Sequence, residues 1–265
     1  MPCIYLGGNF VEESSIRPKR NLTLDCYKGL LIILVVIRHV LQYSVADEGG
    51  ILTNIIWAVQ MPGFMLVSGY FAARKNRGIG KTILKNCERY LLPFLTWFVL
   101  IHVLLFGEYD RNVLKGLSEL FLHVDKGLWF LWVIFVLSVI AAICNKIFSG
   151  KGGMIKRSVF AVAACGVFFG ALLGVALFTG NLNILGIKLV LYYAVFYCFG
   201  YLVKLTEDFW KKYWDKIKNT FFFICLAVFF AIVFNYDLYH SEDDLIGIML
   251  RCAAGFTGNA VLLCV

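Results

Sequence analysis

The chain has 265 residues, of which 60% are apolar and only 16% are charged, and its formal net charge is +8. A water-soluble domain carries about 25% charged residues, so this composition excludes an ordinary soluble fold. Long apolar runs recur along the chain, each close to the roughly 20 residues with which a helix crosses the hydrocarbon core of a bilayer.

Eight membrane-spanning helices are predicted from these runs. In chain order they cover residues 27–45, 51–73, 90–107, 127–145, 158–178, 184–203, 219–236 and 245–265. Each helix satisfies its own backbone hydrogen bonds, as a chain inside lipid must. The expected fold class is all-α, a polytopic transmembrane helical bundle of about eight spans. Residues 1–20 are expected to form a cytoplasmic N-terminal arm, and residues 21–265 a single membrane domain.

The positive charges follow a topological pattern. Eighteen of the 25 Lys and Arg residues lie in the N-terminal arm and in the alternate connections 73–90, 145–158 and 203–219. Basic residues gather in this way on the cytoplasmic side of membrane proteins, which predicts a cytoplasmic N-terminus. The basic excess is an orientation signal in the lipid bilayer, so no nucleic-acid partner is expected. The nine cysteines show no metal-ligand spacing, and no metal site is predicted.

The first span is apolar, yet it carries Asp25, Lys28, Arg38 and His39. On a helix, residues eleven apart lie within about 20° of each other and about 16 Å apart along the axis. Lys28 and His39 therefore share one stripe, with Asp25 one turn before Lys28, whereas Arg38 points elsewhere. Ionisable side chains inside a span usually face a bundle interior or a wet cavity, which favours a functional site along this stripe.

Each of these residues also has a purely structural explanation. Asp25 and Lys28 lie near the membrane boundary, where a lysine reaches the interface at little cost and anchors the span. His39 can be a packing residue with a hydrogen-bonded ring. Histidine, with a reference pKa of about 6.5, is equally suited to remove a proton near neutral pH.

Five segments form a recognisable series. The first is the Lys28-x10-His39 spacing, preceded by Leu-Asp at 24–25. The others are VQMPGFMLVSGYF (59–71), ILKNCERYLLPFLTW (83–97), GLWFLWVIF (127–135) and FYCFGYL (196–202). In this order they resemble the membrane acyltransferase-3 family, and within it the fucose 4-O-acetylase-like branch.

The resemblance implies an integral-membrane O-acyltransferase, which moves an acyl group from cytoplasmic acyl-CoA, commonly acetyl-CoA, to a hydroxyl of a cell-surface or exported glycan. It implies that His39 is the catalytic base, that Lys28 and Asp25 shape the site, and that no cofactor is bound tightly. It also implies a multi-pass protein of the cell (inner or plasma) membrane. Members of the family have about ten spans, so this chain is expected to be shortened at its C-terminus.

Basic residues between the second and third spans are candidates to contact the donor. Arg and Lys side chains hold phosphate groups, and coenzyme A would present them at the cytoplasmic mouth to Arg74, Lys75, Lys85 and Arg89. The bias of positive charge toward the cytoplasm explains the same four residues. Relatives often have two arginines three apart in this connection, where this chain has Lys85 and Glu88.

Three further side chains are candidates to contact the acceptor. Ser68 lacks the surroundings of a nucleophilic serine, and its Ser-Gly pair is typical of close helix packing in membranes. Tyr70 is expected at the inner boundary as an interfacial aromatic residue. Trp129 begins the fourth span, where it belongs either to an aromatic belt or to a stacking platform for a sugar.

Two other functions fit intramembrane charges. A small-solute or lipid-carrier transporter also places them in its spans, but it predicts two related halves, and the sequence shows no such repeat. A truncated, inactive relative is the second alternative. An acyltransferase consumes acetyl-CoA in a His39-dependent way, a transporter moves solute without it, and an inactive relative does neither.

Overall fold

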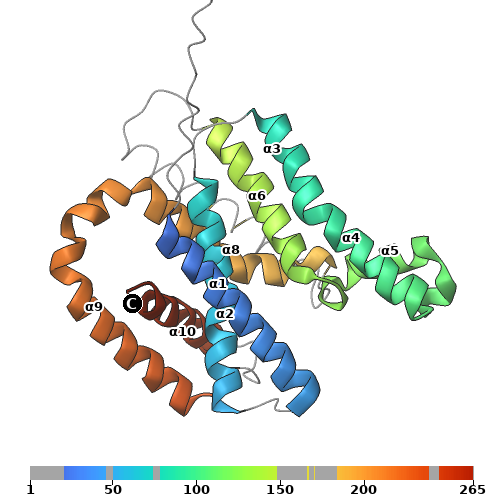
Figure 1. Cartoon of the computed structure of the whole chain (residues 1–265). Helices are drawn as coiled ribbons and strands as arrows, with labels where there is room; N and C mark the ends of the chain where they lie inside the picture. The colour runs from blue at the N-terminus through green and yellow to red at the C-terminus, as the bar shows by residue number, and fades with distance from the viewer. Residues whose placement is uncertain are drawn as a thin grey trace, which may run out of the picture.

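The computed structural model describes residues 21–45, 50–73, 78–147, 166, 170, 184–238 and 245–264. These parts of the chain form helices joined by short connections, with no strand among them. The α-helices are α1 (Leu22–Val40), α2 (Ile51–Ala72), α3 (Ile79–Asn86), α4 (Leu92–Phe98), α5 (Val113–Leu122), α6 (Trp129–Ile147), α8 (Ile187–Leu205), α9 (Glu207–Asn235) and α10 (Leu245–Cys264). Figure 1 shows them as one bundle with α9 curving around one side.

Within the described parts, six helices are long and apolar enough to cross a membrane, which confirms an all-helical, multi-pass arrangement. They are Ile51–Ala72, Ile79–Leu105, Trp129–Lys146, Ile187–Leu205, Glu207–Asn235 and Ile246–Cys264. The predicted first span, 27–45, covers the later part of α1 and a π-helical turn, Leu41–Val45, and is not among these six helices. The predicted span 158–178 lies almost entirely outside the described residues, so the total of eight stays a prediction.

One predicted boundary was wrong because charged residues were interpreted as a connection. The third span begins at Ile79 rather than at residue 90, since α3 and α4 are joined by a π-helical turn and form one helix to Leu105. The basic connection 203–219 is helical, with Thr206 alone between α8 and α9. A helix does not have to end where the hydrocarbon core ends, because charged side chains at its end can reach water.

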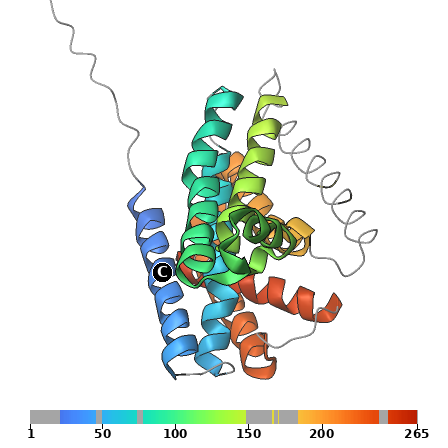
Figure 2. The same cartoon turned by 90° about the vertical axis from the view of Figure 1, so that its right-hand side faces the viewer.

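α2 forms the centre of the bundle. Its 22 residues include no charged side chain, so it can be buried on every face. It packs against α1, α6, α8, α9 and α10, and α1 and α2 lie side by side in both views (Figures 1 and 2). On one side Met65 joins a core with α6 and α8, and on the other Val59 joins a core with α1, α9 and α10.

α2 and α8 approach closely at two glycines. A side chain on Gly69 would collide with the carbonyl group of Tyr197, and one on Gly200 would collide with the carbonyl group of Leu66. Small residues allow helix backbones to approach in a membrane, where packing replaces the hydrophobic effect as the driving force. This crossing fixes the C-terminal end of α2, where Tyr70 and Phe71 lie.

A buried hydrogen-bond network fixes α1 and α10 against α2. The Tyr27 hydroxyl donates to Asn259 Oδ1, and Asn259 Nδ2 donates to the carbonyl oxygens of Val59 (3.1 Å) and Gly255 (2.6 Å). Asn259 is fully buried, so these protein groups make the hydrogen bonds that water cannot make there. Because Tyr27 directly precedes Lys28, the network also fixes the rotation of α1 about its axis, and with it the direction in which the stripe of Lys28 and His39 points relative to α2.

Candidate active site

α1 begins at the candidate site with a capped first turn. Asn21 Oδ1 accepts a hydrogen bond from Leu24 N (3.3 Å), and Asp25 lies where the helix dipole favours a carboxylate. Lys28 Nζ lies 2.7 Å from Asp25 Oδ1, and the two side chains are 36% and 28% exposed. The predicted ion pair is therefore present, and water and solutes can reach it.

Two lysines lie over successive aromatic rings at the end of α2. Lys28 Nζ is 4.9 Å from the centre of the Phe71 ring, and Lys204 Nζ is 4.8 Å from the centre of the Tyr70 ring. The two rings meet edge-on, with centroids 5.7 Å apart. An ammonium group is attracted to the face of an aromatic ring. The end of α2 thus holds one cation from α1 and another from α8.

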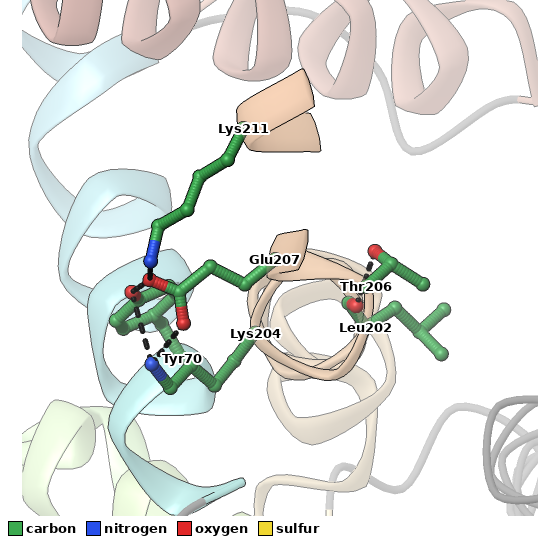
Figure 3. A network of polar contacts seen from close by, with 6 residues as sticks. All are labelled: Tyr70, Leu202, Lys204, Thr206, Glu207 and Lys211. Carbon is green, nitrogen blue, oxygen red and sulfur yellow. Dashed lines mark hydrogen bonds and ion pairs between the residues drawn. The ribbon is translucent and has the colours of Figure 1, made fainter. Parts of the chain in front are cut away.

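Glu207 joins Tyr70 to two lysines (Figure 3). The Tyr70 hydroxyl donates to Glu207 Oε1 (3.2 Å) and accepts from Lys204 Nζ (3.3 Å). Glu207 also forms ion pairs with Lys204 and with Lys211, the latter at 3.0 Å. The network connects α2, α8 and α9 at the end of the bundle where Lys28 lies.

Glu207 is held in its charged form. It stands at the start of α9, in a stretch (207–218) with seven charged residues that precedes the apolar, membrane-crossing part of the helix. The hydrogen bond from Lys204, with a second from Lys211, lowers the pKa of the Glu207 carboxyl to about 2. Glu207 is therefore a carboxylate at any physiological pH and keeps both ammonium groups near Tyr70.

Asn145, on α6, caps the C-terminal end of α2. Its Nδ2 donates to the carbonyl oxygen of Ala72 (2.7 Å), and its Oδ1 accepts from the Tyr201 hydroxyl (2.6 Å). A carbonyl in the last turn of a helix has no partner within that helix. Asn145 supplies the partner, so α6 and α8 together hold the turn that carries Tyr70 and Phe71.

His39 lies about 16 Å along α1 from Lys28, on the same stripe. Its imidazole is exposed and stacks on Tyr43, with ring centroids 5.8 Å apart and planes at 10°. The face that α1 buries is the neighbouring one, formed by Tyr27, Leu31 and Arg38. In the described parts of the chain, Arg38 is thus the buried basic residue (5% exposed), and the described residues leave the His39 ring uncovered.

The candidate donor-binding residues lie on an exposed helix. Lys85 is in the last turn of α3, and Arg89 is in the π-helical turn that follows; both are exposed. The Arg89 guanidinium lies 5.9 Å from the centre of the neighbouring Tyr90 ring. Arg74 and Lys75 lie outside the described residues. Nothing in the described contacts brings Lys85 or Arg89 to Lys28, so their role stays a prediction.

The three candidate acceptor residues lie in different surroundings. Ser68 is half-buried on α2, beside the glycine at the crossing with α8. Tyr70 belongs to the Glu207 network. Trp129 is half-buried and stacks on Tyr193, with centroids 5.1 Å apart and planes at 24°. Tyr70 is the one of these that the described contacts link to the end of α2 where Lys28 lies.

Lys204 and Glu207 were not predicted as site residues. Their separation of three residues indicates an ion pair across one helical turn. It does not indicate that the pair would reach Tyr70, which is 134 residues from Lys204 in the chain. Within the described parts of the chain, no three His, Cys, Asp or Glu side chains gather closely enough to hold a metal ion.

The sequence model of a family described as "Acyltransferase domain" (acyltransferase-3) matches residues 21–264, nearly the whole chain. The chain belongs to the acyltransferase-3 family. This confirms the resemblance of the five segments. Together with the helices that can cross a bilayer, it identifies a multi-pass membrane protein of an acyltransferase family.

The curated proteins similar to this chain include two described as "Nodulation protein NolL". That of Sinorhizobium fredii is 27% identical over 218 residues, which are 79% of this chain and 56% of the relative. That of Mesorhizobium japonicum is 25% identical over 271 residues, which are 92% of this chain and 66% of the relative. The chain thus spans less than two thirds of the length of these relatives. No solved structure matches it.

Proposed function

We propose that this protein is an integral-membrane O-acyltransferase that moves a short acyl group, acetyl in the first instance, from cytoplasmic acyl-CoA to a hydroxyl of a cell-surface or exported glycan. The observation that carries the proposal is the stripe on α1. It has a paired, accessible ammonium group at Lys28 and an accessible imidazole at His39, about 16 Å further along the helix. A transferase needs both a place for an anionic donor and a proton acceptor.

The donor would approach the end of the bundle that carries Lys28. The phosphates of acyl-CoA are anionic, and ammonium groups bind phosphate through charge-assisted hydrogen bonds. Lys28 lies over the Phe71 ring and Lys204 over the adjacent Tyr70 ring, so an anion at this end of the bundle would meet two ammonium groups. An extended pantetheine arm would then lead the thioester along α1 toward His39.

His39 would act as the base. Its neutral imidazole removes the proton from the acceptor hydroxyl while the oxygen attacks the thioester carbon. The new C–O bond forms, the tetrahedral intermediate collapses, and the C–S bond breaks. The proton passes from His39 to the departing thiolate, which leaves an O-acyl ester, the free thiol of coenzyme A and an unchanged protein.

The location proposed for this reaction is the cell membrane, inner or plasma, with the Lys28 end in the cytoplasm. The basic connections support this orientation, since they gather at the ends of spans that the positive-inside rule assigns to the cytoplasm. A glycan acceptor would approach from the other side of the membrane, and Trp129 offers it a half-buried aromatic ring.

The test is transfer of radiolabelled acetyl from acetyl-CoA to a pool of cell-surface glycans, with the purified chain in lipid nanodiscs. We expect radiolabel in the glycan fraction. Alkali should release this label, because it hydrolyses O-acetyl esters. Release of thiol without label in any glycan would contradict a glycan acceptor. Solute movement across a bilayer without use of acetyl-CoA would instead support the transporter alternative.

A further inference from the structure

The first part of α9 has a composition unlike that of any other described helix. Residues 207–218 contain seven charged side chains and, among them, five large apolar ones. In Figure 1, α9 curves, so that this first part runs in a different direction from the apolar part that follows. The sequence places this part on the same side as the other basic connections.

Helical geometry sorts these side chains onto separate faces. At 100° per residue, the five apolar ones fall within an arc of about 140°. This aromatic face of α9 consists of Phe209, Trp210, Tyr213, Trp214 and Ile217.

The charges around this face are also ordered. Asp208 and Asp215 lie almost directly opposite the centre of the aromatic face. Four lysines lie at its two edges, Lys211 and Lys218 at one and Lys212 and Lys216 at the other, and Glu207 lies at the same edge as Lys211, with which it pairs.

The described parts of the protein leave most of the aromatic face uncovered, with Trp214 half-buried. Phe209, Trp210, Tyr213 and Ile217 are all exposed, Phe209 at 54% of its surface. On the opposite side, the Asp215 side chain is 87% exposed. A surface hollow of about 330 Å³ opens along the Lys211 edge, with Trp210 and Trp214 in its wall. An apolar arc of this size in water is unfavourable unless something covers it.

The arrangement matches the layers of a membrane surface. Tryptophan, tyrosine and phenylalanine rings are favoured at the boundary between headgroups and acyl chains. Lysines at the edges of such a face extend upward to the level of the phosphates, and carboxylates opposite it remain in water. Four edge lysines against the single edge carboxylate of Glu207, with Asp208 and Asp215 turned away, give a net attraction for a negatively charged surface.

We propose that residues 207–218 of α9 form an interfacial segment that binds anionic phospholipid headgroups. The aromatic face lies at the acyl boundary, and the edge lysines contact the phosphates. Lys212 and Lys216 make no ion pair within the described parts of the chain, and Lys212 Nζ lies 5.5 Å from the centre of the Tyr213 ring, so both charges are available to lipid. Lys211, by contrast, is shared with Glu207, and Lys218 Nζ lies 3.5 Å from Asp215 Oδ1. This proposal goes beyond acyl transfer. Lipid binding and acyl transfer are tested separately, and a negative result for one does not contradict the other.

The experiment is native mass spectrometry of the full chain in detergent, titrated in parallel with phosphatidylglycerol and phosphatidylcholine. The test variant is Lys212→Gln/Lys216→Gln/Lys218→Gln, which leaves the Lys204–Glu207–Lys211 network intact. The control is Lys115→Gln/Lys126→Gln/Lys188→Gln, which removes the same charge from the predicted opposite side. Gel filtration establishes that each variant is folded and monodisperse before the titration.

We expect wild type to retain phosphatidylglycerol over phosphatidylcholine. The test variant should bind phosphatidylglycerol at least about tenfold more weakly, because each lysine near an anionic surface adds to the attraction, and the control should bind it as wild type does. Equal retention of the two lipids by wild type would overturn the proposal, as would equal losses in both variants. If the triple variant does not fold, Lys212→Gln/Lys216→Gln is titrated in its place, with Lys115→Gln/Lys126→Gln as control, and the same outcomes apply.

Discussion

Gly69 and Gly200 face each other's helices at the crossing of α2 and α8, and each lies against a backbone carbonyl group of the opposite helix. The two contacts are reciprocal, so neither helix can shift to make room for a side chain without opening the other contact. The turn of α2 that follows carries Tyr70 and Phe71. This close helix contact therefore positions the rings over which Lys28 and Lys204 lie.

The first prediction concerns this crossing. Gly69→Ala or Gly200→Ala should lower the free energy of unfolding by about 3 kcal/mol, because backbone cannot yield as a flexible side chain does. The measurement is thermal unfolding of the purified protein in detergent. Gly29→Ala is the matched control, since a Cβ there meets nothing within 4 Å, and it should be neutral or stabilising by up to about 1 kcal/mol. Equal melting of Gly69→Ala and wild type would show that the crossing is looser than described.

The second prediction concerns the buried amide of Asn259. Asn259→Ala leaves the Tyr27 hydroxyl and the Val59 carbonyl without their described partner, at a cost of about 1–3 kcal/mol for a buried polar group. In the background of Tyr27→Phe the same change should cost less, because one of the orphaned groups is gone. A double-mutant cycle in thermal unfolding measures this coupling. Additive effects would rule out the hydrogen bond as a stabilising contact.

The third prediction concerns Glu207 and acid. Its folded-state pKa lies below its reference value of 4.5, so its contribution to stability is fully present above that value and is lost as the pH falls toward 2. Glu207→Gln should lower the melting temperature at pH 7 and flatten its fall between pH 4.5 and pH 3. Asp215→Gln is the control, because Asp215 is exposed and its nearest lysine is 3.5 Å away. Identical pH profiles for Glu207→Gln and wild type would contradict the network.

The fourth prediction separates donor binding from chemistry at Lys28. Under the proposed function, Lys28→Gln should raise the KM for acetyl-CoA about tenfold or more, because a charge-assisted contact contributes roughly 1.5–3 kcal/mol. Lys28→Arg should restore most of the lost affinity for acetyl-CoA, since the positive charge remains. Lys115→Gln, which removes an exposed lysine paired with Asp110, is the control and should leave KM unchanged. A fall in kcat with an unchanged KM would place Lys28 in the chemical step instead.

The sequence predicted those features that belong to one segment. Apolar runs are local, so the spans corresponding to α2, α6 and α8 were found close to their ends. The spacing of Lys28 and His39 is likewise a property of a single helix. The start of α3 was missed because its charged residues were taken as a connection before the third span, whereas charge marks only the end of the apolar part of a helix.

What depends on packing between distant segments could not be predicted. The direction of the Lys28 stripe is set by which face of α1 rests on α2, and that face is chosen by Tyr27, Leu31 and Asn259, the last of which is 232 residues from Tyr27. For the same reason the sequence did not indicate that Arg38, rather than His39, is the buried residue. The contact between Tyr70 and Lys204 exists only because α8 packs against α2, and no local spacing in the sequence predicts that packing.

The measurement that tests the account most directly is release of free thiol from acetyl-CoA by the full chain in lipid nanodiscs with a glycan pool, comparing wild type, His39→Ala and His102→Ala. His102 is the matched control, a histidine near the end of another spanning helix that pairs with Glu108. The account predicts that thiol release disappears in His39→Ala and persists in His102→Ala. Release at the wild-type rate from folded His39→Ala would contradict it, because the imidazole on α1 would then have no part in the reaction.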